Sequence, residues 1–217
     1  MVINKYLAEL LGTFILVGIG SLGILSVGGA AGAAEIIAIA FAFGLALLAG
    51  IWVVGHVSGA HFNPAVTLGM LLDGRISLSD AIGYWVGQFA GASVASAVIW
   101  VAAGSRAGAA ATATTYGDLS TAILVEVLLT ALFVWTILAV TKSGRNQAPA
   151  VIALTLVAVH IVGIPFSGAS VNPARSFGPA VIGGAGVGDL WVYIYAPLIG
   201  AVIAYALYRL FPVEGTE

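Results

Sequence analysis

The sequence predicts an all-α membrane protein in which six transmembrane helices and two re-entrant half-helices form an inverted repeat. Three observations predict this class: few charges, long apolar segments and one Asn-Pro-Ala motif that occurs twice. Charged residues make up 7% of the 217 residues, and the mean hydropathy is +1.12. A soluble domain contains about 25% charged residues, so the composition excludes one.

The same composition excludes several kinds of site. The net charge is −2 and no run of basic residues occurs, so nothing favours nucleic acid as a partner. The chain has no Cys, and its three His are not at ligand spacing, so we expect no disulfide, no metal and no cofactor. The N-terminus, MVINKYLAELLGTF, lacks a small-residue cleavage signal and predicts a retained first span.

A bilayer core needs about 20 apolar residues per helix. Four segments with at most one charge each predict one transmembrane helix: residues 10–34, 81–105, 119–141 and 190–208. Two further segments, 36–72 and 146–188, are too long for one span and too short for two spans with a turn. Each therefore predicts one full span followed by a half-length helix.

Both half-length helices begin at an Asn-Pro-Ala motif, Asn63-Pro64-Ala65 and Asn172-Pro173-Ala174. Proline suits the first helical position because its missing N–H is not needed there. Asparagine suits the N-cap because its side-chain oxygen accepts backbone N–H groups. One such motif would favour a simple capped kink. Two copies in matching apolar contexts favour a pair of half-helices buried in protein or lining a water-filled cavity.

The two motifs belong to a longer repeat. SGAHFNPA at 58–65 matches SGASVNPA at 167–174, an offset of 109 positions, which is half the chain. We expect one domain over 1–217, made of a first repeat over about 1–108 and a second over about 109–217. Because each repeat holds three full spans, an odd number, the two repeats must face opposite ways across the membrane.

Basic residues predict the orientation. In a six-span arrangement one side of the membrane carries Lys5, Arg75, Lys142, Arg145 and Arg209, and the other carries Arg106 and Arg175. Cytoplasmic loops carry an excess of Lys and Arg, so both termini are expected in the cytoplasm and the protein in the cell (plasma or inner) membrane.

Two Asn-Pro-Ala motifs, the second continued by Arg175, in a six-span inverted repeat resemble the aquaporin (major intrinsic protein) family over essentially the whole chain. The short termini are similar to those of a compact prokaryotic-type member. The resemblance implies a passive, water-selective channel and no enzyme activity. It also implies one pore in each subunit and four subunits side by side, as a homotetramer in the lipid bilayer.

The pair of Asn-Pro-Ala motifs then has a physical function. Two opposed half-helices bring two positive dipole ends to one point. Because each asparagine oxygen is held by its cap, the amide N–H₂ of Asn63 and Asn172 is expected to be free to face the lumen. A water molecule there accepts from both groups, so its orientation is imposed and a continuous proton wire is interrupted, while the dipoles repel cations.

The resemblance implies further pore residues. Acceptor carbonyls along the path are expected from Gly59, Ala60, His61, Gly168, Ala169 and Ser170. An outer constriction is expected from Phe43, His160, Ala169 and Arg175. Glycerol-conducting relatives usually have Gly in place of His160 and Asp in place of Ser176. The aromatic pattern of span six differs from that of many water channels, so an aquaglyceroporin-like channel for glycerol or other small neutral solutes stays as an alternative.

Two acids, Glu9 and Glu126, lie within predicted spans. They could form a proton relay. One acid per repeat favours a bracing function instead, in which each carboxylate accepts N–H groups from the non-helical stretch before its half-helix. For His56 and His61, fixed hydrogen bonding is favoured over titration in the pore. Small residues at every fourth position, Gly83, Gly87 and Gly91, favour close packing within the subunit over a dimer seam.

Two other classes compete with a channel. A secondary transporter also uses inverted repeats and broken helices, but it needs ionisable residues near its binding site. Here such residues near the inferred path are His160 and Arg175. A membrane enzyme needs a nucleophile with a base or a metal triad, and the sequence shows neither pattern. The channel is therefore the favoured function.

Overall fold

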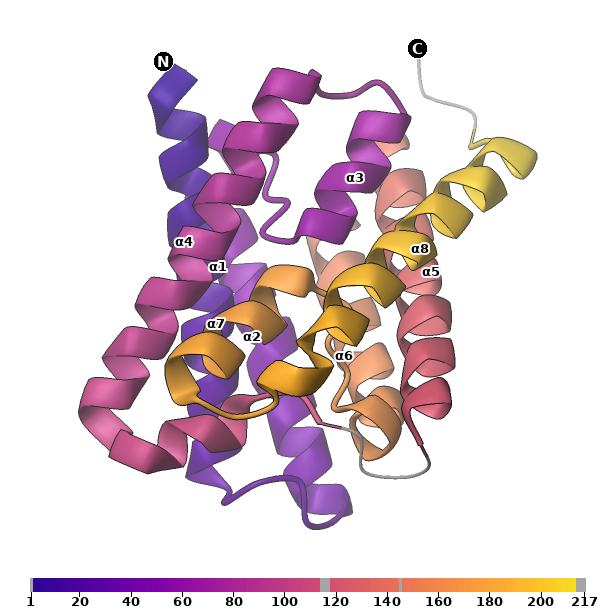
Figure 1. The fold of residues 1–217 in the computed structure, drawn as a ribbon. Helices are drawn as coiled ribbons and strands as arrows, with labels where there is room; N and C mark the ends of the chain where they lie inside the picture. The colour runs from indigo at the N-terminus through magenta and orange to yellow at the C-terminus, as the bar shows by residue number, and fades with distance from the viewer. Residues whose placement is uncertain (1, 114–117, 145, 214–217) are drawn as a thin grey trace.

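The computed structural model describes residues 2–113, 118–144 and 146–213, and this part of the chain is entirely helical or loop. Figure 1 shows the helices in chain order. The long helices are α1 (Val2–Ser26), α2 (Ala33–Ser58), α4 (Leu78–Ala103), α5 (Leu119–Lys142), α6 (Ala148–Ser167) and α8 (Leu190–Leu210). Between them lie the half-helices α3 (Pro64–Leu72) and α7 (Pro173–Gly183) and the 3-10 helices η1 (Gly104–Ala110) and η2 (Val187–Asp189).

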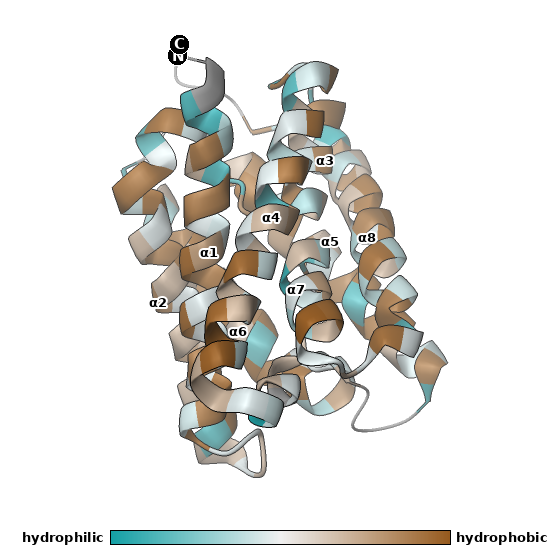
Figure 2. Ribbon diagram, turned by 60° about the vertical axis from the view of Figure 1, so that its left-hand side comes forward, coloured by the Kyte–Doolittle hydropathy of each residue, from teal (hydrophilic) through white to brown (hydrophobic). Residues whose placement is uncertain are grey.

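Six of these helices are long and apolar enough to cross a membrane, as the sequence predicted. Hydrophobic residues predominate along them (Figure 2). Large apolar side chains such as Trp52, Val86 and Leu154 are more than half exposed, which suits a lipid environment. The protein is therefore an integral membrane protein.

The half-helices α3 and α7 enter from opposite ends of the bundle and meet with their N-termini in its interior (Figure 1). The first turn of α1 and the last turn of α8 lie at the same end of the molecule (Figure 1). Both features agree with the six-span inverted arrangement.

The first predicted span is present, but its predicted bounds, residues 10–34, are wrong. The candidate span covers Asn4–Ser26 and includes two charged residues that the uncharged segment left out. Lys5 pairs with Asp80 at 2.7 Å near the end of the bundle, and Glu9 is fully buried among hydrogen-bond donors. At the other end, Gly28 and Gly29 have φ of 76° and 104°, a left-handed conformation that ends the helix and that glycine adopts without strain.

The other spans lie close to their predicted ranges. Helix α5 differs from the predicted 119–141 by one residue, and α8 starts at residue 190 as predicted. The segments 36–72 and 146–188 each divide into a full helix and a half-helix that begins at the proline of its motif. The sequence did not predict the two 3-10 helices, η1 and η2, which follow α4 and precede α8.

The small residues of α4 and α8 pack against other helices of the same chain. A Cβ on Gly91 would lie 2.2 Å from the carbonyl oxygen of Leu10, and one on Gly87 would lie 2.7 Å from that of Tyr6. On α8, a Cβ on Gly200 would lie 2.7 Å from the carbonyl oxygen of Val127. The expectation of close packing within the subunit is confirmed, and this packing brings α1 against α4 and α5 against α8.

Candidate pore

Each half-helix is capped by its asparagine. The Oδ1 atom of Asn63 accepts from the Ala65 N–H at 2.8 Å, and that of Asn172 accepts from Ala174 at 3.0 Å and Arg175 at 3.3 Å. Both asparagines have extended backbone, and a proline follows each at the start of the helix. The predicted caps are therefore confirmed.

The asparagine amides also join the two half-helices. The Nδ2 atom of Asn63 donates to the carbonyl of Val171 at 2.7 Å, and that of Asn172 donates to the carbonyl of Phe62 at 2.9 Å. The expectation that both amide hydrogens are free is wrong, because the facing loops meet closely enough to take one. An amide has two N–H bonds, so one from each asparagine is left for the cavity that both residues line.

The loops before the half-helices have an unusual backbone. Ala60, Phe62, Ala169 and Val171 have φ between 45° and 56°, in the left-handed region that non-glycine residues rarely adopt. Such residues persist only where the surrounding structure holds them. The buried carboxylates of Glu9 and Glu126 supply that support.

Glu9 accepts four hydrogen bonds. Its Oε1 atom accepts from the Ser58 hydroxyl at 2.7 Å and the His61 N–H at 2.9 Å. Its Oε2 atom accepts from the Phe62 N–H and from Nε2 of Gln88, each at 2.7 Å. The carboxylate thereby ties α1, the loop before α3 and α4 into one unit.

Glu126 holds the other loop in the same way. It accepts from the Ser167 hydroxyl and from the N–H groups of Ser170 and Val171, each at 2.7 Å. These three partners stand 109 positions after the corresponding partners of Glu9. Both acids therefore make the contacts expected of a brace.

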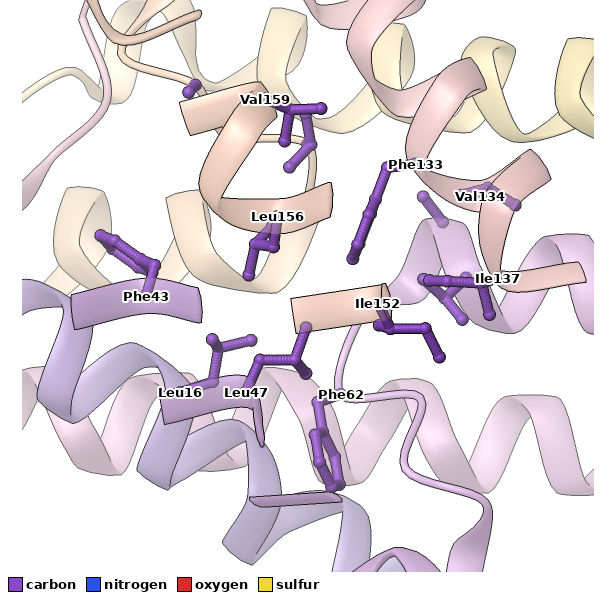
Figure 3. Packing of buried hydrophobic residues seen from close by; sticks show 14 of the residues in the cluster. Leu16, Phe43, Leu47, Phe62, Phe133, Val134, Ile137, Ile152, Leu156 and Val159 are labelled. Atoms are coloured by element: carbon purple, nitrogen blue, oxygen red, sulfur yellow. The ribbon is translucent and has the colours of Figure 1, made fainter. Parts of the chain in front are cut away.

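A cavity of about 120 Å³ runs through the centre of the bundle. At the end that holds both termini it is lined by Thr141, Ala148 and Pro149. It continues past Asn63 and Asn172 and reaches the group formed by Phe43, His160 and Arg175. Figure 3 shows part of its apolar wall, to which α1, α2, α5 and α6 contribute Leu16, Phe43, Leu47, Phe133, Ile137, Ile152 and Leu156.

A second cavity of about 160 Å³ lies toward the opposite end, and Arg175 lines both cavities. At this junction the rings of Phe43 and His160 stack with centroids 4.6 Å apart, and Cζ of Arg175 lies 4.8 Å from the Phe43 centroid. All three side chains are at most 3% exposed. We call these three residues the constriction, after the position at which the resemblance predicts a narrowing.

Backbone carbonyls fix two constriction side chains. Arg175 donates from Nη1 to the carbonyl of Ala110 in η1 at 3.0 Å, and His160 has Nδ1 at 2.9 Å from the carbonyl of Leu156. Nε2 of His160 and Nε of Arg175 are buried and have no partner among the described residues. Buried polar atoms normally have a partner, so these two atoms leave hydrogen-bonding capacity unused beside the first cavity, which both residues line.

The remaining predicted positions differ in where they lie. Gly59, Ala60, His61 and Ser170 line the first cavity, and Gly168 lines the second. Ala169 lines neither cavity. It is fully buried, and its Cβ lies 3.0 Å from where a Cβ on Gly163 would stand, so its side chain packs toward α6.

Two residues near the site were not predicted. Gln88 binds Glu9, and Gly20 leaves room for the constriction, since a Cβ there would lie 2.2 Å from the Phe43 ring. A polar residue inside the apolar segment 81–105 was a usable signal for Gln88. No local pattern marks Gly20. Among the described residues no group of three His, Cys, Asp or Glu could hold a metal ion.

Comparison with known proteins identifies the family. A family model described as major intrinsic protein matches residues 1–208. The chain is 42% identical over 209 residues to the glycerol uptake facilitator protein-like 6 of Lactiplantibacillus plantarum, covering 93% of this chain and 94% of that protein. It is 37% identical over 229 residues to aquaporin Z of Rhodopseudomonas palustris, covering 98% and 95%.

A solved structure, that of the aquaglyceroporin from Plasmodium falciparum, has the same fold. Its TM-score is 0.85 at 24% identity, and 96% of each chain is covered. The fold, the paired Asn-Pro-Ala half-helices and these relatives lead to one conclusion. The chain belongs to the major intrinsic protein family of membrane channels.

Proposed function

We propose that this channel conducts water passively and selectively, and that it excludes glycerol, protons and ions. The observation that carries the proposal is the constriction, where Phe43, His160 and Arg175 close around the junction of the two cavities. Relatives named aquaporin Z support it.

The chemistry of the constriction favours water over larger solutes. The stacked rings of Phe43 and His160 occupy one wall, so a solute wider than water must displace a ring. Arg175 supplies a fixed positive charge that opposes cations, and its buried donors can bind the oxygen of water. Ala169 is outside this group in the structure, so the proposal does not depend on it.

Proton exclusion is assigned to the meeting point of the half-helices. One N–H of Asn63 and one of Asn172 remain for the cavity, beside two positive helix ends. A water there accepts two hydrogen bonds and directs its own hydrogens away from the centre. The two waters on either side then face opposite ways, and the proton wire is interrupted.

The acids support a channel over a proton-coupled transporter. Glu9 and Glu126 direct both carboxylate oxygens at protein donors, and neither residue lines a described cavity. A relay needs a carboxylate that exchanges protons with the path. We therefore assign both acids a bracing function.

We also propose the assembly and orientation that the family resemblance and the charges favour: a homotetramer in the cell membrane, each subunit with its own pore and both termini cytoplasmic. Lys5 lies near the start of α1, Arg75 follows α3, Lys142 ends α5 and Arg209 lies in the last turn of α8, whereas Arg145 lies outside the described residues. Repeat boundaries near 1–108 and 109–217 fit the corresponding contacts of Glu9 and Glu126.

Glycerol conduction is the second candidate, because the relative with 42% identity is named a glycerol uptake facilitator-like protein. Stopped-flow light scattering of proteoliposomes separates the two. With sucrose outside, fast shrinkage compared with empty liposomes is expected. With glycerol outside, shrinkage followed by slow reswelling at the rate of empty liposomes is expected. Reswelling as fast as the shrinkage would assign the protein to glycerol conduction.

A further inference from the structure

A chain of buried hydrogen bonds leads from Glu9 to the wall of the cavity. Nε2 of Gln88 donates to Oε2 of Glu9 at 2.7 Å and to Oγ1 of Thr67 at 2.9 Å. The same Oγ1 lies 3.1 Å from Nδ1 of His61. Gln88, Thr67 and Glu9 are fully buried, and His61 is 7% exposed and lines the cavity.

The direction of each bond follows from the groups involved. A carboxylate accepts hydrogen bonds, so the NH₂ group of the Gln88 amide faces Glu9. It donates one hydrogen to Glu9 and the other to Thr67. Oγ1 of Thr67 accepts one of them. The single O–H of this buried hydroxyl then has Nδ1 of His61 as its acceptor among the described residues. Nδ1 is therefore unprotonated, and Nε2 carries the hydrogen.

The surroundings hold the ring in place. The Tyr84 ring contacts His61 edge-on, with centroids 5.0 Å apart, and its hydroxyl donates to the carbonyl of Ser58 at 2.6 Å. The titratable and charged groups that face His61 are Glu9 of α1, Tyr84 of α4 and Arg75 after α3. The Glu9 carboxylate is already saturated by four donors, and the positive charge of Arg75 is paired with Asp73 at 2.7 Å.

We propose that Gln88 and Thr67 are positioning residues that fix His61 as a neutral imidazole donating its Nε2–H into the water path. The proposal rests on the proposed water channel and adds a donor on the side of the asparagines that holds both termini. Protonation of Nδ1 would make it a donor that faces the Thr67 hydroxyl. The O–H of Thr67 would then have no acceptor in a buried site. His61 therefore keeps one protonation state over the range in which histidines usually titrate.

The second repeat offers a matched comparison. There Thr112 donates to Ser176 at 2.9 Å, Ser176 donates to Ser170 at 2.6 Å, and Ser170 donates to the carbonyl of Asn172 at 2.9 Å. Ser176 and Ser170 stand 109 positions after Thr67 and His61. This chain of donors ends on a backbone carbonyl instead of an imidazole, so its loss cannot create a titrating group.

The test uses ¹⁵N-histidine-labelled full-length protein in lipid bilayers, with the His61→Asn variant to assign the His61 signals. In the wild type, NMR should show His61 as the Nε2–H tautomer from about pH 5.5 to about pH 8. In Thr67→Val, which keeps the shape of the side chain and removes the hydroxyl, His61 should show both tautomers and titrate. Thr67→Ser should restore the wild-type signals.

Water permeability of the same proteins is then measured against internal pH. The wild type and Ser176→Ala should vary by less than about 1.5-fold, and Thr67→Val by more than about twofold, between about pH 5.5 and about pH 8. An Nδ1–H tautomer, or titration of wild-type His61 in this range, overturns the proposal. If Thr67→Val does not fold, Gln88→Leu tests the same chain. Because the tautomer is read without flux, a protein that holds the Nε2–H form and conducts no water would contradict the channel function alone.

Discussion

Asn63 and Val171 are joined by a hydrogen bond of 2.7 Å across the meeting point of the two half-helices. The same asparagine caps its own helix through Oδ1. One side chain therefore fixes the end of α3 and also ties it to the loop before α7. Both bonds therefore fix how the two half-helices meet beside the cavity that Asn63 lines.

Replacing Asn63 by Asp separates the two bonds. The carboxylate can still cap α3, but it has no hydrogen to donate, so it faces the carbonyl of Val171 with a second acceptor. We expect the loop before α7 to move away from the start of α3, which should lower the water permeability. A new cation leak is also expected, because a negative charge replaces a donor. Stopped-flow and liposome proton-flux assays measure both. Unchanged flux with no leak would show that the bond to Val171 is dispensable.

The two buried acids should differ in how much they stabilise the fold. In either orientation a Gln at position 9 sets its NH₂ against two donors, so a backbone N–H loses its acceptor and Ser58 or Gln88 must also turn. A Gln at position 126 can set its NH₂ against one donor, the Val171 N–H. At about 1–3 kcal/mol for each orphaned donor, Glu9→Gln should lower the apparent melting temperature more than Glu126→Gln.

Asp189→Asn, at an exposed position in η2, is the control for the loss of one negative charge and should melt like the wild type. Neither glutamine variant should lose a proton-coupled flux, because the wild type is expected to have none. A proton-coupled flux that disappears in Glu126→Gln, with the fold intact, would revive the relay.

The absence of a side chain at Gly20 should determine where the Phe43 ring of the constriction lies. A Cβ at this position would lie 2.2 Å from the Phe43 ring, so Gly20→Ala should push that ring toward His160 and Arg175. We expect water permeability to fall at least about twofold, as overpacking moves side chains off their preferred rotamers. Adding Phe43→Leu should restore the flux.

Gly18→Ala on the same helix is the matched control, because its Cβ would make an ordinary contact of 3.8 Å with Ala95. Equal permeability of the two alanine variants would show that the Phe43 ring moves without narrowing the path.

His160 and Arg175 should separate size selection from charge selection. His160→Ala removes the ring that stacks on Phe43, so glycerol or urea should enter while protons stay excluded at Asn63 and Asn172. Replacing Arg175 as well removes a fixed positive charge, and a proton or cation leak should appear. The two effects need not add, since the residues share one lumen. If His160→Ala passes water alone, His160 does not limit the width.

Mercurial reagents should have no effect on the wild type, because the chain has no cysteine. Introduced cysteines can then map the path. Leu156→Cys lies on the cavity wall and should be blocked in a thiol-reversible way, whereas Leu154→Cys on the same helix is 60% exposed on the outer surface and should not. Block at position 154 and not at 156 would reverse the assigned face of α6. Ala169→Cys tests the constriction position that the resemblance implied and the structure buries.

Local signals predicted most of the fold. Asn63 and Asn172 cap the half-helices, and the proline after each stands at the first helical position. These effects act within a few residues, so the half-helices could be placed from sequence. The first span was misplaced because an uncharged window cannot show that Glu9 finds four donors from distant segments.

The constriction required the resemblance, because Phe43, His160 and Arg175 come from three helices and Phe43 is more than 100 residues from the other two. Gly20 could not be assigned from sequence for the same reason, and the polar Gln88 within an apolar segment was a signal that did not reveal its partner. Their functions depend on a ring and a carboxylate that only the tertiary fold brings near.

The bond between Asn63 and Val171 also bears on how the protein is made. Its partners are 108 residues apart, so 171 of the 217 residues must be made before the first half-helix can reach its final contact. Until then α3, nine residues long, is too short to cross the bilayer, and two of the helices that contact it, α7 and α8, have still to be made. The second half of the chain is therefore needed before the first half-helix can reach its final position, and a product truncated before residue 171 should leave the Asn63 amide without this partner.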